Sequence, residues 1–145
     1  MTLYLDTSSL VKLYVEEPGS DAVQALVRRA AVVATSDIAY PEARAALARR
    51  RRERHLAAPA LVRARDAFET DWPRYLAVGV SPAICREAGA LAERYRLRGY
   101  DCVHLACYLQ IARAAGAVDT QFSSFDDRLN RAARSAVRTL RTVKH

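Results

Sequence analysis

The stretch that decides the fold is Leu3-Tyr4-Leu5-Asp6-Thr7-Ser8-Ser9-Leu10-Val11. Its apolar start predicts a short strand over residues 2–5, and either Thr7 or Ser8 can cap a helix that runs to about Tyr14. The stretch therefore places Asp6 at the carboxyl end of a buried strand. In proteins with parallel sheets, ligands bind beyond the carboxyl ends of the strands.

Outward from this stretch, the apolar periodicity switches repeatedly between that of a strand and that of a helix. The further helices that we expect cover residues 21–29, 36–54, 59–78, 83–95, 100–115 and 126–135. The further strands that we expect cover residues 31–34, 118–123 and 137–143. This alternation predicts an α/β sandwich around a mostly parallel sheet, and the length of 145 residues predicts a single domain over residues 1–145.

The composition indicates a folded protein with an anionic partner. The chain is 51% hydrophobic and 27% charged, which is typical of globular and not of disordered proteins. Its formal net charge of +7 favours nucleic acid as a partner and, second, an acidic membrane surface. A high arginine content can also reflect coding bias, so the charge alone does not decide the function.

The cysteines and the apolar segments point to the cytoplasm. Cys85, Cys102 and Cys107 are an odd number without C-x-x-C spacing, which argues against a disulfide framework and a zinc site. The residues after Met1 run directly into a strand, so we expect no signal peptide. No uninterrupted apolar segment is long enough to span a bilayer. We therefore expect a protein of the reducing cytoplasm.

Three further acids share the setting of Asp6. Glu42, Asp101 and Asp126 each lie among apolar or small residues. A lone carboxylate is costly to desolvate in such a place, so these side chains should be paired, protonated or bound to a cation. Carboxylates that gather in a basic protein predict a Mg²⁺ or Mn²⁺ site that acts on phosphate, because both ions prefer oxygen ligands.

Structural roles are open alternatives for the same acids. Asp6 and Asp101 can each serve as a helix N-cap, and Glu42 lies where the helix dipole favours a carboxylate. Either Asp126 or Asp127 can cap the last helix.

Two other residues stay undecided at this point. His104 shares a helix face with Asp101, where a histidine can be either catalytic or structural. Asp119 is a weaker candidate acid on an expected surface turn.

Four segments in order resemble the motifs of the PIN-domain family, and specifically of its VapC-type toxins. They are Leu3–Tyr14, Ser36–Arg49, Asp101–Ala106 and Ser124–Ala133. The resemblance implies a three-layer α/β/α fold with a central parallel sheet, and a homodimer. It also implies a metal-dependent endoribonuclease that uses Mg²⁺, or Mn²⁺ in its place, to cleave RNA phosphodiester bonds. A cognate antitoxin protein would hold this activity in check.

The resemblance also assigns roles to individual residues. Asp6, Glu42, Asp101 and Asp126 match the acidic catalytic set of the family. Of these, Asp6, Asp101 and Asp126 would bind the metal directly, and Glu42 is a candidate for binding through a water. Thr7, Ser8 and Ser124 would support the acids, with Ser124 standing where the family often has threonine.

The densest basic stretch offers a place for RNA. Arg49, Arg50, Arg51 and Arg52 continue the helix that carries Glu42, and guanidinium groups suit phosphate. Our hypothesis is that these arginines guide RNA, such as a structured tRNA loop, toward the acids. The alternative is a solvated helix end where cations complement the helix dipole.

Two other functions compete with the nuclease. An aspartyl-phosphate phosphatase would use Asp6 as its nucleophile, but Ser8 occupies the position where such enzymes usually carry a second aspartate. A non-catalytic RNA-binding module would suit the charge, but it would not need four partly buried acids.

Overall fold

A parallel four-stranded sheet lies at the centre of the computed structural model, which describes residues 1–142. The strands stand in the order β3-β2-β1-β4. Thr2 of β1 lies opposite Val32 of β2 and Thr120 of β4. The bounds are β1 (Thr2–Leu5), β2 (Val32–Ser36), β3 (Leu76–Val78) and β4 (Thr120–Ser123).

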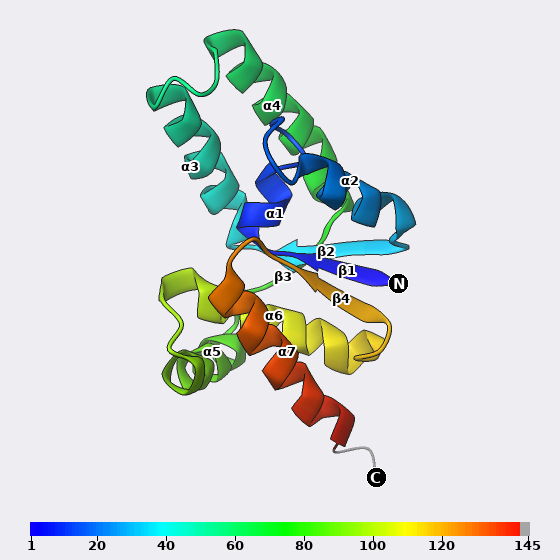
Figure 1. The fold of residues 1–145 in the computed structure, drawn as a ribbon. Helices are drawn as coiled ribbons and strands as arrows, with labels where there is room; N and C mark the ends of the chain where they lie inside the picture. The colour runs from blue at the N-terminus through cyan, green and yellow to red at the C-terminus, as the bar shows by residue number, and fades with distance from the viewer. Residues whose placement is uncertain (143–145) are drawn as a thin grey trace.

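Helices cover both faces of this sheet (Figure 1). The first layer consists of α1 (Thr7–Val11), α2 (Ser20–Arg29), α3 (Ala39–Arg52) and α4 (Ala58–Asp71). The second layer consists of α5 (Pro82–Tyr95), α6 (Gly99–Ala115) and α7 (Asp127–Thr142). The predicted three-layer α/β/α fold with a parallel sheet is confirmed.

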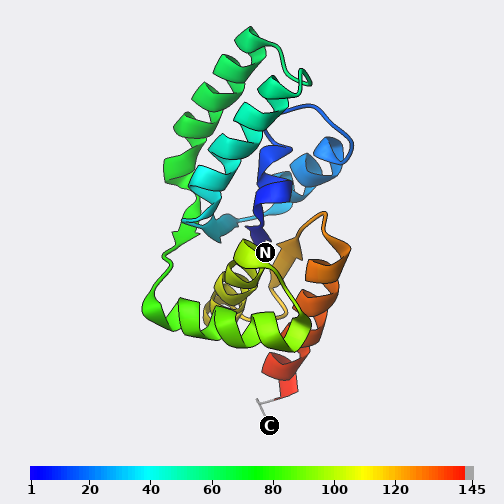
Figure 2. The ribbon, with the colours of Figure 1, turned by 90° about the vertical axis from the view of Figure 1, so that its left-hand side faces the viewer.

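Each face of the sheet has its own core because successive side chains of a strand point to opposite faces. Leu3 and Leu5 of β1 pack in the core beneath α1–α4, together with Phe68. Tyr4, between them, packs in the core beneath α5–α7, together with Leu105 of α6. All four strands are parallel, so their carboxyl ends lie at the same edge of the sheet. This edge faces the viewer in Figure 2. Side chains from both layers can meet at that edge.

The helix expected over residues 59–78 is wrong in its second half. α4 ends at Asp71, a 3₁₀ turn (Trp72–Arg74) follows, and Leu76–Val78 forms the edge strand β3. Pro73 explains the break, because proline has no backbone N–H to donate and restricts the residue before it.

The last strand, expected over residues 137–143, is also wrong. α7 runs without interruption to Thr142, and Val143 lies outside the described residues. The buried side chains of α7 recur with the period of a helix and not of a strand. They are Leu129, Ala132, Ala133, Ala136 and Val137.

The remaining expected helices and strands are present, with ends that differ by a few residues; α1, for example, ends at Val11 and not at Tyr14. No helix within residues 1–142 is both long and apolar enough to cross a bilayer.

Candidate active site

Asp6 lies at the end of β1 and is the N-cap of α1. Its Oδ1 accepts hydrogen bonds from the backbone N–H of Ser9 at 3.0 Å and from the hydroxyl of Ser8 at 2.7 Å. The same Ser8 hydroxyl accepts a bond from the N–H of Phe125 at 3.0 Å. Asp6 therefore caps the helix, which is one of the alternatives that the sequence left open, and Thr7 and Ser8 do not. Ser8 ties Asp6 to the loop after β4.

Glu42 lies in the first turn of α3 with its carboxylate partly buried. Its Oε1 accepts a hydrogen bond from the Thr7 hydroxyl at 2.6 Å and contacts Nε2 of His104 at 2.8 Å. Burial works against the charged form, but the hydrogen bonds from His104 and Thr7 outweigh it and lower the pKa of Glu42. Glu42 is thus held as an ionised carboxylate.

His104 is buried on α6 and connects Glu42 to the centre of the sheet. Its Nδ1 lies 2.9 Å from the hydroxyl of Tyr4. In a neutral imidazole that satisfies both contacts, Nε2–H donates to Glu42 and Nδ1 accepts from Tyr4. The sequence singled out His104 but missed Tyr4, which looked like an ordinary apolar strand residue. The two lie 100 positions apart, so only the fold reveals the pair.

Asp101 lies in the first turn of α6, whose N-cap is Arg98, so Asp101 is not itself the cap. Within residues 1–142 its carboxylate receives no hydrogen bond. Burial raises the pKa of Asp101, and the negative charges of Asp126, Asp6 and Glu42 add to the increase. These acids come from four segments far apart in the sequence, and they share one electrostatic environment.

Asp126 follows β4 and is more exposed than the other acids. Its Oδ1 accepts from the N–H of Leu129 at 2.7 Å, so Asp126 and not Asp127 caps α7. The Ser124 hydroxyl accepts from the N–H of Asp126 at 3.0 Å, and the Ser124 carbonyl accepts from the Asn130 amide at 2.9 Å. Ser124 therefore supports the loop that carries Asp126, and Asn130 is a supporting residue that the sequence did not indicate.

Asp119 lies away from these acids. It is exposed and precedes β4, and its carbonyl accepts from the N–H of Thr2, at the amino end of β1. This position is at the opposite edge of the sheet from Asp6 and Asp126.

The donor chemistry of the site fits a hard cation. The four acids offer oxygen atoms, and both burial and the neighbouring negative charges work against the ionised form of Asp101. In the conformation described for residues 1–142, no three His, Cys, Asp or Glu side chains stand close enough together to hold a metal ion. The three-carboxylate arrangement of Asp6, Asp101 and Asp126 is thus not formed here and stays a prediction. Mg²⁺ commonly uses one or two carboxylates and several waters, which these residues can supply.

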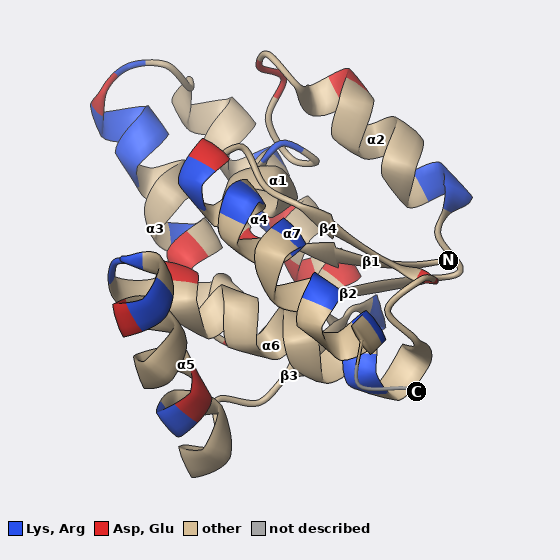
Figure 3. Cartoon of the chain, turned by 60° about the horizontal axis from the view of Figure 1, so that its bottom comes forward, with Lys and Arg blue, Asp and Glu red and all other residues tan. Residues whose placement is uncertain are grey.

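The arginines at the end of α3 are partly engaged by acids. Arg50 binds Glu17 through two nitrogens, at 2.8 and 3.0 Å, and Arg49 binds Glu53 at 2.9 Å. The bond to Arg50 lowers the pKa of Glu17 against the effect of burial, and Lys12 lowers it further. Figure 3 shows that Lys and Arg gather at this end of α3 and also recur along α7.

Comparison with known proteins agrees with the fold and identifies the family. The model of the PIN domain family matches residues 3–135. The chain is 36% identical over 134 residues to Ribonuclease VapC45 of Mycobacterium tuberculosis strain CDC 1551 / Oshkosh. It has the same identity to Ribonuclease VapC49 of strain ATCC 25618 / H37Rv. Each alignment covers 92% of this chain and 90% of the relative. The chain therefore belongs to the PIN domain family, as its sequence motifs predicted.

Proposed function

We propose that this chain is an endoribonuclease toxin of the VapC type, which hydrolyses RNA phosphodiester bonds with the help of Mg²⁺ or Mn²⁺. The observation that supports the proposal is that Asp6, Glu42 and Asp126 lie near enough to Asp101, beyond the carboxyl edge of the sheet, for their negative charges to act on its carboxyl group. Burial and the negative charges of the other three acids raise the pKa of Asp101, and a bound cation would oppose both effects. The 36% identity to two ribonucleases supports the same activity.

The side chains have separable roles in this proposal. Asp6, Asp101 and Asp126 would hold the cation, and Ser8 and Ser124 keep two of these acids in place. When bound, the cation would neutralise phosphate charge and lower the pKa of a nearby water.

Glu42 is suited to the proton transfer. Thr7 and His104 both bond its Oε1, and within residues 1–142 its Oε2 receives no hydrogen bond. Because Glu42 is held ionised, Oε2 can take a proton from the water that attacks phosphorus. The water oxygen forms a bond to phosphorus, the bond from phosphorus to the leaving ribose oxygen breaks, and that oxygen takes up a proton from solvent water.

Other parts of the proposal rest on the family resemblance. They are the cognate antitoxin, the homodimer, the preference for Mg²⁺ with Mn²⁺ as a substitute, and a single PIN-like unit over residues 1–145. A reducing cytoplasm suits the three thiols, Cys85, Cys102 and Cys107, which are all free.

The decisive experiment incubates the purified chain with total tRNA in Mg²⁺, Mn²⁺ or EDTA. We expect discrete fragments with either metal and none in EDTA. Asp101→Asn should lower the cleavage rate on the order of 100-fold or more, because it removes charge from the site without removing a hydrogen bond to the protein. Asp119→Asn is the matched control: it removes one exposed carboxylate at the opposite edge and should cleave like the wild type.

Four results would contradict the nuclease. RNA cleavage that continues in EDTA would exclude a metal-dependent site. A cleavage rate of Asp101→Asn equal to that of the wild type would exclude this site. Tight RNA binding without cleavage under any metal would favour a binding module. Hydrolysis of p-nitrophenyl phosphate with a trapped phosphoaspartate at Asp6 would favour the phosphatase.

A further inference from the structure

The surface beside the acids carries arginines on the α5–α7 side of the site. A hollow of about 280 Å³ is lined by two of the acids, Asp101 and Asp126, together with Arg98 and Arg128. A second hollow adjoins it through Arg128 and is lined by Arg96 and Arg131 as well. We call Arg96, Arg98, Arg128 and Arg131 the arginine rim. All four side chains are exposed.

The arginine rim differs in its partners from three arginines of α3, Arg44, Arg49 and Arg50. Arg44, Arg49 and Arg50 each form an ion pair with a glutamate. No member of the rim forms an ion pair within residues 1–142, although Arg98 and Arg128 line the same hollow as two carboxylates. Among the described residues, the one hydrogen bond from a rim side chain runs from Arg128 to the carbonyl of Arg96, at 3.3 Å. The rim therefore keeps guanidinium donors available for an anion.

An aromatic ring stands next to this surface. Phe125, in the loop between β4 and α7, is 47% exposed. Its backbone is held by Ser8, and the ammonium of Lys12 lies 4.5 Å from the centre of its ring. The ring also approaches Gly19 so closely that a Cβ there would stand 2.5 Å from a ring carbon. The Phe125 ring thus packs against Lys12 and Gly19, while 47% of the residue is exposed to solvent.

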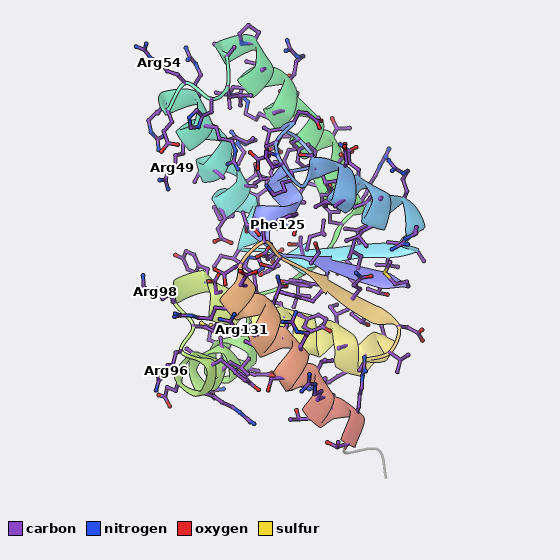
Figure 4. All side chains as sticks on the ribbon, viewed as in Figure 1. Arg49, Arg54, Arg96, Arg98, Phe125 and Arg131 are labelled. Atoms are coloured by element: carbon purple, nitrogen blue, oxygen red, sulfur yellow. The ribbon has the colours of Figure 1, made fainter. Side chains whose placement is uncertain are left out.

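Figure 4 shows how these groups are arranged. Arg96, Arg98 and Arg131 lie in the α5–α7 layer, and Phe125 lies at the loop where that layer meets the sheet. Arg49 and Arg54 lie along the end of α3, in the opposite layer. A chain of phosphates that passes the acids could follow either direction. On the α5–α7 side, Arg98 and Arg128, which form no ion pair within residues 1–142, line a hollow with Asp126, the residue that follows the exposed Phe125.

We propose that an unpaired segment of RNA crosses the acids on the α5–α7 side, with its phosphates on the arginine rim and a base stacked on Phe125. This inference rests on the proposed function and names the surface of this chain that would hold the substrate. A single strand fits the surface, because proteins bind single strands by combining a basic groove with aromatic stacking platforms. Bases within a duplex are stacked on one another and are not free to stack on Phe125.

The test measures RNA binding in the Asp101→Asn background, so that it does not depend on cleavage. A fluorescent single-stranded RNA of mixed sequence is titrated in EDTA, and its anisotropy is followed at several salt concentrations. Arg98→Ala/Arg128→Ala should weaken binding about 10-fold or more and reduce the slope of log affinity against log salt by about 1.4. Two other double variants remove the same charge: Arg49→Ala/Arg54→Ala at the end of α3, and Arg28→Ala/Arg29→Ala at the end of α2. Both should change binding much less.

Two conservative substitutions test the role of the Phe125 ring. Phe125→Leu keeps an apolar side chain without a ring and should weaken single-strand binding about 5-fold or more. Phe125→Trp should restore it. Neither substitution should change the binding of a duplex of the same sequence.

Equal losses in the three double-arginine variants would overturn the arginine rim. An unchanged affinity in Phe125→Leu, equal losses on single strand and duplex, or no RNA binding by the parent protein would overturn the proposal. Cleavage of tRNA by the unsubstituted chain is scored separately, so a failed binding surface and a failed nuclease give different results.

Discussion

At the scale of single residues, Asp101 differs from the other three acids. Asp6, Glu42 and Asp126 each accept hydrogen bonds from the protein, whereas the carboxylate of Asp101 accepts none within residues 1–142. Burial and the neighbouring negative charges raise its pKa above the ordinary value of 3.8. The folded chain therefore binds a proton at Asp101 more tightly than the unfolded chain does, and its ionised form destabilises the fold.

The upward shift of the pKa of Asp101 predicts how the free energy of unfolding depends on pH. As pH rises from 3.8 through the raised pKa of Asp101, the folded state loses stability relative to the unfolded state, and above that pKa the penalty is constant. Asp101→Asn cannot ionise. In EDTA it should therefore have a higher free energy of unfolding than the wild type at pH 7, and the difference should shrink toward pH 3.8.

Urea denaturation at a series of pH values measures this difference. Asp119→Asn serves as the control, because Asp119 is exposed at the opposite edge and faces none of these acids. Asp101→Asn would contradict the prediction if it were less stable than the wild type at pH 7, or if its gain were the same at every pH.

At the scale of helices and loops, the start of α2 and the loop after β4 depend on each other. Gly19 is the N-cap of α2 with φ +96°, a conformation that favours glycine. A Cβ at this position would stand 2.5 and 2.7 Å from two ring atoms of Phe125. Gly19→Ala should therefore lower the free energy of unfolding by about 2 kcal/mol, from backbone strain and from the contact with the ring.

Gly89 provides the matched control for this prediction. It lies within α5, and a Cβ built there meets no atom within 4 Å. Gly89→Ala should stabilise the chain by about 0.5–1 kcal/mol, because alanine loses less conformational freedom in a helix. Both changes are read from urea denaturation midpoints. If Gly19→Ala were as stable as Gly89→Ala, the approach of Phe125 to Gly19 would not be a real constraint.

The same scale shows which elements a sequence can predict. β1 and α6 were predicted well, because β1 joins a clear apolar run to a polar turn and α6 is an apolar stretch between Gly99 and Gly116. β3 is three residues long, too short for a periodic signal, although Pro73 could have marked the end of α4. In α7 the β-branched Val137, Thr139 and Thr142 favour a strand locally, although the buried positions up to Val137 recur with a helical period.

In the candidate site too, local features could be predicted from the sequence and contacts between distant segments could not. The positions of Asp6 and Asp126 relative to their strands were predictable, because the end of a parallel strand is a local feature of the sequence. The bonds that orient the site join distant segments: Tyr4 to His104, and Thr7 to Glu42. No local pattern predicts such pairs, since they depend on which layers the fold brings together.

At the scale of the whole molecule, the site joins two separately packed layers. Asp6 and Glu42 are positioned by α1 and α3 in one layer, and Asp101 and Asp126 by α6 and α7 in the other. Each layer has its own core on its own face of the sheet. A cation held by carboxylates of both layers can bind only when both are folded on the sheet.

Binding that requires the complete fold must stabilise it. At a Mg²⁺ concentration 100 times its Kd, the stabilisation should be about 2.7 kcal/mol. For a chain of this length, that corresponds to a rise in Tm of about 5–10 °C. Scanning calorimetry in Mg²⁺, against NaCl of equal ionic strength, separates binding from screening of the net charge of +7. Asp101→Asn should lose most of the rise and Asp119→Asn should keep it. An equal rise in both variants would mean that Mg²⁺ binds elsewhere, and the acids would then be a structural feature of the sheet edge.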